Sequence, residues 1–294
     1  MKLKINLCCK LLMLISLVGS AQEVESNSIY IKNFEKSNNV LEFEGIRMTN
    51  HTGLIKRSQI YYGEKVDFHY DNITGFKLTD SIAYLDMNIY ALDVKGDTVM
   101  SKENLFNDLK EEFKESKLDL FNSVTFADPF LPGKTYSIHV EIIDKKSDAF
   151  YHWNKSFTII NHPRFLNDVN GIKYDILYLY SGDRDISIID NLIMPFEQVY
   201  FIVEGLEGFV QDENGMVSIE CSVTIADSNN EVLMTNPNMI PNPVEAKELK
   251  KQIFGSITVD DQVKINPINC SIAIKDRWSD KYLKSQFNLV VNKE

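Results

Sequence analysis

The chain has 294 residues, with 31 Lys and Arg against 42 Asp and Glu, and a formal net charge of −11. An acidic chain disfavours nucleic acid and anionic membrane surfaces as partners, because both attract basic patches. Hydrophobic residues make up 44% of the sequence, which is enough to fill two ordinary domain cores.

The chain begins with the order of features found in a secretory signal peptide. Three lysines, a short apolar stretch and three small residues follow one another: Lys2, Lys4 and Lys10, then Leu11 to Val18, then Gly19, Ser20 and Ala21. The apolar stretch is about half of the roughly 20 residues that a membrane-crossing helix needs. We therefore expect residues 1–21 to be a signal peptide, cleaved after Ala21. The remaining chain is expected to be exported, to the periplasm or the cell surface, without stable membrane insertion.

Two parts of the chain share one pattern, which indicates a tandem repeat. Six residues match at identical spacing: Glu64, Val66, Phe68, Ile73, Gly75 and Phe76 against Glu197, Val199, Phe201, Leu206, Gly208 and Phe209. The closing segments also correspond: Tyr136, Ile138, Val140, Ile142, Asp144, Ser147, Phe157 and Ile159 against Ile268, Cys270, Ile272, Ile274, Asp276, Ser279, Phe287 and Leu289. We expect a first domain over residues 22–162 and a second over residues 163–294.

Within each repeat, apolar and polar residues alternate, which is the period of a strand with one buried face. Turns rich in Gly, Asn, Asp and Pro separate these strands, as in an all-β sandwich. Lys102 to Phe121 breaks the pattern, with Leu105, Leu109 and Phe113 at helical spacing, and is expected to be a short helix inserted in the first domain. Its counterpart, Pro243 to Phe254, is expected to form one or two turns.

The closing hairpin of the first repeat carries a resemblance at the level of the fold. It runs from Leu131-Pro132-Gly133-Lys134-Thr135-Tyr136 into Ile142-Ile143-Asp144-Lys145-Lys146-Ser147. In this the chain resembles bacterial immunoglobulin-like β-sandwich domains of exported proteins. The resemblance implies two tandem immunoglobulin-like antiparallel sandwiches. It assigns no functional residue, because this fold hosts many unrelated functions.

The common catalytic motifs are missing from the sequence: the G-x-S-x-G elbow, the H-E-x-x-H helix, the P-loop and G-x-G-x-x-G. We assign no catalytic residue and no cofactor. His139 and Glu141 are expected to point outward from one strand, with His152 near them on the paired strand. Three such ligands could hold zinc. Outward polar side chains on neighbouring strands are more often simply solvated, and no metal site is assigned.

One strand of the first domain offers a candidate ligand-binding surface. If Leu85, Met87 and the apolar residues that follow face the core, four side chains point outward in a row: Tyr84, Asp86, Asn88 and Tyr90. Two aromatic rings beside polar groups suit a sugar, since rings stack on its apolar face while polar groups bind its hydroxyls. The alternative is cross-strand packing, because Tyr is a favoured strand residue.

Two cysteines follow the expected signal peptide, Cys221 and Cys270, and export would permit a disulfide between them. Both occupy inward positions of the second repeat. A bridge between facing strands spans the core in immunoglobulin-like sandwiches, so we expect a Cys221–Cys270 disulfide. The alternative is a pair of buried thiols that pack as small hydrophobes.

These features favour a non-enzymatic binding or interaction protein that contacts a glycan or another protein. The alternative is a metal-dependent or hydrolase-type enzyme with its site in the cleft between the two domains.

Overall fold

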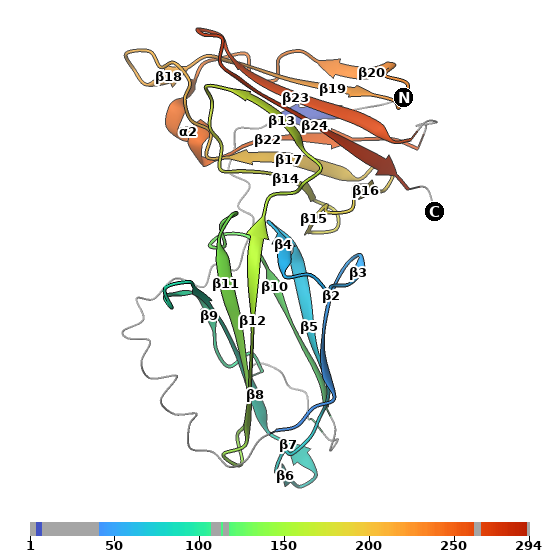
Figure 1. Ribbon diagram of the computed structural model, residues 1–294. Helices are drawn as coiled ribbons and strands as arrows, with labels where there is room; N and C mark the ends of the chain where they lie inside the picture. Colours follow the sequence, from blue (N-terminus) through green and yellow to red (C-terminus); the bar gives the residue numbers. More distant parts are fainter. Residues whose placement is uncertain (1–3, 8–40, 107–112, 114–117, 262–265, 293–294) are drawn as a thin grey trace. The chain divides into compact units, whose positions relative to one another are not determined.

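The computed structural model describes residues 4–7, 41–106, 113, 118–261 and 266–292 (Figure 1). It divides the chain into two compact units, of which one comprises Met13–Ile160 and the other Met1–Leu12 with Asn161–Glu294. They are called here the first unit and the second unit. The division after Ile160 lies close to the expected domain boundary.

The first unit consists of two antiparallel sheets packed face to face. One sheet has the order β10 (Leu118–Thr125), β5 (Lys65–Ile73), β2 (Gly45–Asn50) and β3 (Gly53–Leu54). The other has the order β4 (Gln59–Tyr61), β12 (Phe150–Ile160), β11 (Thr135–Asp144), β8 (Leu85–Asp93) and β9 (Thr98–Lys102). A small hairpin, β6 (Leu78–Thr79) with β7 (Ile82–Ala83), completes the described strands of this unit.

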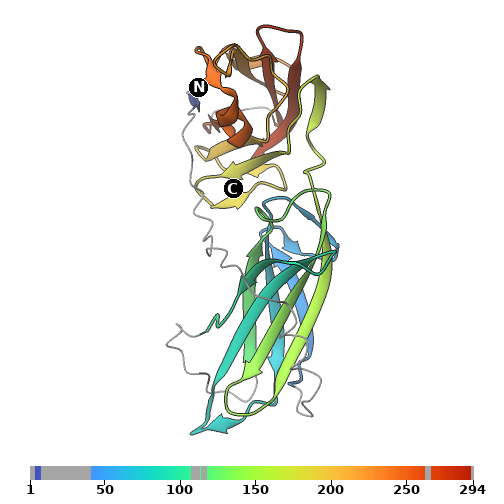
Figure 2. The same ribbon diagram turned by 90° about the vertical axis from the view of Figure 1, so that its left-hand side faces the viewer.

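The second unit repeats this arrangement (Figures 1 and 2). One sheet has the order β1 (Lys4–Leu7), β22 (Ile253–Thr258), β17 (Gln198–Glu204), β14 (Ile176–Ser181) and β15 (Ile186–Ser187). The other has the order β13 (Leu166–Asn170), β24 (Tyr282–Val291), β23 (Ile268–Asp276), β19 (Ile219–Ala226) and β20 (Val232–Asn236), and β16 (Leu192–Ile193) also pairs with β24. The second unit also contains a two-stranded pair, β18 (Met216–Val217) with β21 (Val244–Glu245), and the helix α2 (Ala246–Lys251), which follows β21 directly.

The strand order of both units is that of an immunoglobulin-like sandwich. In that fold strands A, B and E share one sheet, and C, F and G share the other. In the first unit β2, β5 and β10 take the first set, and β8, β11 and β12 the second. A short strand pairs in parallel with the last strand of each unit, β4 with β12 and β16 with β24. The expected fold, two tandem immunoglobulin-like antiparallel sandwiches, is confirmed.

Strand alternation places the core between the two sheets of each unit. Along β10 buried and exposed residues strictly alternate, which is the pattern of a strand with one wet face. Phe68, Ile138 and Phe157 are fully buried in the first unit. Phe201 and Val223 are fully buried in the core cluster of the second.

The two units also repeat their buried carboxylates. Glu64 is paired with Arg57 at 2.6 Å and accepts the backbone N–H of Tyr61 at 3.0 Å. Glu197 is paired with Arg184 at 2.7 Å and accepts the N–H of Met194 at 2.6 Å. Asp144 and Asp276 likewise each accept a serine hydroxyl from their own turn and a backbone N–H from a distant segment. Polar anchoring is therefore part of the repeated unit, in addition to its apolar pattern.

The strand register corrects one detail of the repeat. Tyr136 lies opposite Phe157 in the first unit, whereas its counterpart Ile268 lies opposite Leu289. Phe157 therefore corresponds to Leu289 and not to Phe287. The slip is two residues, so both assignments put the residue on the inward face, and the sequence pattern could not separate them.

The α-helix in the described residues is α2, inside the segment where one or two turns were expected. Half of the segment expected to be a helix in the first unit, residues 107–112 and 114–117, lies outside the described part of the chain. Its first residue, Lys102, belongs to β9, and its last residues belong to β10.

The predicted disulfide between Cys221 and Cys270 is wrong. Both side chains are buried, as expected, but no bridge joins them. They lie on β19 and β23, which are neighbours in one sheet, and Cys270 is opposite Ile225. Cys221 lies four residues before Ile225 on β19. At the usual rise of a strand, this places it about 13 Å along the strand from the position opposite Cys270. A disulfide needs Cα atoms within about 7 Å.

Candidate binding site

Three neighbouring strands of the first unit bring polar and aromatic side chains together on their outer face. Tyr90 on β8 lies opposite His139 on β11, and Glu141 on β11 lies between Asn88 on β8 and His152 on β12. Their neighbours along the strands, such as Ile89 and Val140, are buried in the core. Because side chains alternate across a strand, these five residues point away from the core.

Tyr90, His139 and His152 form a row of flat rings, called here the Tyr90 row. The rings of Tyr90 and His139 are stacked, with centroids 4.7 Å apart and planes inclined by 8°. The rings of His139 and His152 have centroids 5.3 Å apart and planes inclined by 18°. His139 Nδ1 lies 3.1 Å from His152 Nε2, and His139 Nε2 lies 2.9 Å from the Ser137 hydroxyl. Hydrogen bonds and stacking therefore fix the imidazole of His139 on both sides.

Burial keeps the imidazoles of the row uncharged at neutral pH. It lowers the pKa of His139 to about 4, with a smaller contribution from charge on His152. It also lowers the pKa of His152. At neutral pH the Tyr90 row is consequently an aromatic surface without charge.

Glu141 lies beneath the row and is 1% exposed. Asn88 donates to one of its carboxylate oxygens at 3.4 Å, and the Tyr90 hydroxyl donates to the other at 3.3 Å. Burial raises the pKa of Glu141, while these two hydrogen bonds act against the rise and the charge of Glu103 adds to it. The carboxylate thus anchors Asn88 and Tyr90 from below and is not itself presented to solvent.

The structure divides the row that the sequence predicted along β8. Tyr84 precedes the strand, is 39% exposed, and has the ammonium of Lys146 4.5 Å from its ring centroid. Asp86 is 3% exposed and forms an ion pair with Lys145 at 2.7 Å. Asn88 and Tyr90 remain together through Glu141. The aromatic surface runs across three strands instead of along one of them. The sequence alone could not predict this surface, because it does not give the register in which the strands pair.

Second-unit residues at the corresponding register positions have different side chains. Thr224 replaces Tyr90, Ser271 replaces His139, Ala273 replaces Glu141, and Lys284 replaces His152. The repeated fold therefore does not require the Tyr90 row.

His139 and His152 meet as expected from the sequence, and Glu141 lies directly opposite His152 in the strand register. Among the described residues, however, no group of three or more His, Cys, Asp or Glu side chains has an arrangement suited to a metal ion. The two imidazole nitrogens face each other, as in a hydrogen bond.

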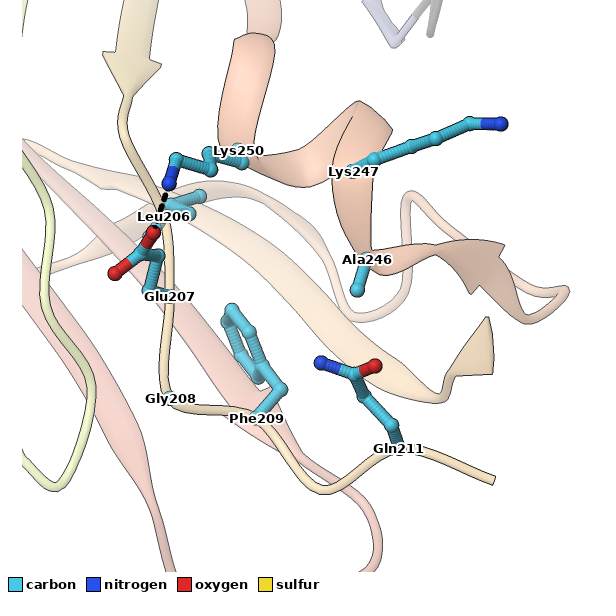
Figure 3. A pocket seen from close by; sticks show the side chains of 8 residues that line it. All are labelled: Leu206, Glu207, Gly208, Phe209, Gln211, Ala246, Lys247 and Lys250. Carbon is cyan, nitrogen blue, oxygen red and sulfur yellow. Dashed lines mark ion pairs between the residues drawn. The ribbon is translucent and has the colours of Figure 1, made fainter. Parts of the chain in front are cut away.

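A depression of about 450 Å³ lies in the second unit between α2 and the segment that follows β17 (Figure 3). Its lining residues come from these two segments: Leu206, Glu207, Gly208, Phe209, Gln211, Ala246, Lys247 and Lys250. The two lysines are already engaged, because Lys250 pairs with Glu207 and Lys247 pairs with Glu245. No lysine charge is left over to mark this depression as an anion site.

Comparison with known proteins identifies no family for the chain. No protein-family model and no curated protein matches the chain. Among solved structures, the chain is similar to the D1–D4 ectodomain fragment of ICAM-5, with 8% identity over 85% of this chain and 54% of that chain, and a TM-score of 0.23. It is also similar to the C-terminal domain of the AgI/II polypeptide BspA of Streptococcus agalactiae, with 11% identity over 84% of this chain and 99% of that chain, and a TM-score of 0.24.

The chain spans about half the length of the ICAM-5 fragment. Superposition scores this low carry no argument about function, so the immunoglobulin-like assignment rests on the strand order described above. Within the described residues, no helix combines the length and the hydropathy of a membrane-crossing segment.

Proposed function

We propose that the protein is an exported, non-enzymatic binding protein of the periplasm or cell surface, and that the Tyr90 row binds a glycan. The row itself supports this proposal most directly. Three rings lie next to one another across β8, β11 and β12, and His152 at its end is exposed. Thr224 and Ser271 at the matching positions of the second unit provide no such surface.

The chemistry of the row suits a neutral sugar. A sugar ring has an apolar face of C–H groups that packs on aromatic faces, while its hydroxyls need hydrogen-bond partners. The faces that Tyr90, His139 and His152 turn toward one another are occupied by stacking, so a sugar would pack on the outer ring faces at the ends of the row. Ser137 and Asn154 flank His139 and supply polar groups at the edge of the row. The lowered pKa of His139 removes positive charge from the surface at neutral pH, which favours a neutral ligand over an anionic one.

A glycan array with the purified protein tests the ligand class. We expect binding to a defined set of neutral glycans, reduced about fivefold by Tyr90→Ala, because a stacked ring contributes on the order of 1 kcal/mol. Thr224→Ala changes the corresponding position of the second unit and should leave binding unchanged. Absence of glycan binding by the wild-type protein, or equal binding by Tyr90→Ala, would contradict the proposal. Capture of a protein partner through the same row would replace the glycan by a protein.

Export is supported by the order of basic, apolar and small residues at the start of the chain. N-terminal sequencing of the protein after expression in a bacterial host tests this directly. We expect the recovered chain to begin at Gln22. A chain that is retained in the cytoplasm and still begins at Met1 would contradict export.

A further inference from the structure

The sheet that contains β22, β17 and β14 has an aromatic outer face. Val199, Phe201 and Val203 of β17 point into the core, so Tyr200 and Ile202 point outward. Ile202 is 2% exposed, Tyr178 on β14 is 6% exposed, and Phe254 on β22 is 7% exposed. The rings also contact one another across the strands, with centroids 6.5 Å apart for Tyr180 and Tyr200 and 5.9 Å apart for Tyr200 and Phe254.

The same face of the first unit is mainly polar, with Phe121 as an exposed aromatic exception. On β2, β5 and β10 most outward side chains form hydrogen bonds with one another, and the Ser123 hydroxyl donates to Asp67. Arg47 holds Asp71 through two bonds, at 2.5 and 2.8 Å, and Thr49 contacts His69 at 2.9 Å. The inner faces of the two sheets are therefore alike. Their outer faces differ, because the outward side chains are mainly polar in the first unit and mainly apolar in the second.

The edges of these two sheets also differ. In the first unit β10 ends the sheet among the described strands. In the second unit the matching strand β22 has a further antiparallel neighbour, β1, with Lys4 opposite Thr258 and Leu7 opposite Gly255. Figure 2 shows this N-terminal strand, in dark blue, beside the second unit. The added strand belongs to the segment expected to be the signal peptide.

An exposed edge strand has unpaired N–H and C=O groups that can receive another strand. Several binding proteins use such an edge to hold an extended peptide. We propose that the edge of β22 is a strand-acceptor site for an extended segment of a partner polypeptide. In the uncleaved chain Lys4–Leu7 occupies the site, and removal of the leader opens it to the partner in the same antiparallel register.

Three observations carry this inference. The register of β1 on β22 shows that the edge accepts a strand. The aromatic outer face begins on β22 itself, at Phe254, so an added strand with apolar residues at alternate positions would extend it. The matching strand β10 has mainly polar residues on its outer side, Asp119, Ser123 and Thr125, and one aromatic residue, Phe121, which stacks on His69. The inference depends on the export part of the proposed function and is independent of the Tyr90 row.

Hydrogen exchange with a peptide probe tests the acceptor. The probe is a synthetic peptide of residues 1–10, with Cys8→Ser and Cys9→Ser to prevent oxidation, added to the protein recovered after export. We expect saturable binding and slower exchange at the amides of Ile253–Thr258. The matching strand, Leu118–Thr125, serves as the control within the same chain and should not change.

A second peptide with Ile5→Pro and Asn6→Pro should bind at least about tenfold more weakly. Neighbouring amides of a strand point in opposite directions, so one of the two prolines removes a hydrogen bond to β22. Equal binding of both peptides, no binding of either, or protection at another edge would overturn the proposal. A dimer that pairs two copies of β22, and that the first peptide dissociates, would replace the partner by a second copy of this chain and overturn the partner assignment.

If the recovered chain still begins at Met1, the proposed export fails, and the acceptor is tested on that chain. Ile5→Pro with Asn6→Pro should then speed exchange at Ile253–Thr258 and leave Leu118–Thr125 unchanged. Unchanged exchange at both segments would overturn the acceptor as well. Glycan binding by the Tyr90 row is measured separately and does not depend on either result.

Discussion

His139 Nδ1 lies 3.1 Å from His152 Nε2, so the two imidazoles share a hydrogen bond in which one donates and the other accepts. Protonation of both rings would remove the acceptor and place two positive charges at this distance. The pair therefore links the Tyr90 row to pH. Glu141 below it is also titratable, and the nearest outward groups on the flanking strands are Tyr90, Asn88 and Asn154.

Acidification should destabilise the first unit between about pH 6.5 and pH 4. Burial lowers the pKa of His139 from 6.5 to about 4, so the folded state favours the neutral ring. The stability contributed by this group is present above pH 6.5 and is lost as the pH falls through the folded pKa. Because His139 is only half-buried, we expect a loss of about 1 kcal/mol after solvent screening.

His139→Gln should reduce the pH dependence of the melting temperature of the first unit, measured by thermal unfolding from pH 4 to pH 8. His51→Gln, on an exposed turn, is the control and should leave that dependence in place. Glu141 has the opposite sign, since its pKa is raised and its contribution is lost as the pH rises. Glu141→Gln should therefore make the loss on acidification steeper. The same slope in wild type and His139→Gln would contradict the assignment.

Cys221 and Cys270 should behave as buried thiols. Burial raises the pKa of the Cys270 thiol to about 12, and the thiolate is the reactive form. In the chain recovered after removal of the leader, which no longer contains Cys8 and Cys9, we expect no alkylation of the native protein at pH 8 and modification of both thiols after unfolding in guanidinium. Thermal unfolding should be the same with and without reductant. An intact mass lower by two hydrogens, restored by reductant, would contradict the register of β19 and β23.

The failure of the disulfide prediction shows which part of the fold a sequence pattern specifies. Alternation identified the inward positions of Cys221 and Cys270 correctly, because the period of a strand is local. It did not identify which sheet each strand joins, which depends on pairing between residues far apart in sequence. The Tyr90 row was not predicted as a row for the same reason. Tyr90, Asn88 and His139 were recognised as outward residues, but their contacts follow from the β8–β11 register.

Glu64 and Glu197 should have similar effects on stability, because each is a buried carboxylate that pairs with an arginine and accepts a backbone N–H, and Glu64 also accepts from the Asn50 amide at 2.7 Å. Replacement by Gln removes the charge and leaves Arg57 or Arg184 without its partner. We expect the free energy of unfolding in urea to fall by about 2–3 kcal/mol in each variant. The loss should affect the unit that contains the substituted residue.

The control for these variants is Glu220→Gln. Glu220 is about half exposed and lies 3.6 Å from Lys275, so this pair should contribute less than about 1 kcal/mol. A loss at Glu64 or Glu197 no larger than at Glu220 would show that the repeated ion pairs do not stabilise the sandwiches.

Gly208 should tolerate no side chain, for two separable reasons. Its φ is +102°, where side chains are strained, and a Cβ would lie 2.5 Å from the carbonyl oxygen of Gly171. Gly96 has a φ of +89° but nothing within 4 Å of a Cβ. Gly96→Ala therefore measures the conformational strain alone, about 1 kcal/mol, and Gly208→Ala should cost at least about 2 kcal/mol more because the backbone must move. Equal losses in urea unfolding would mean that the segment after β17 shifts away from Gly171 at little cost.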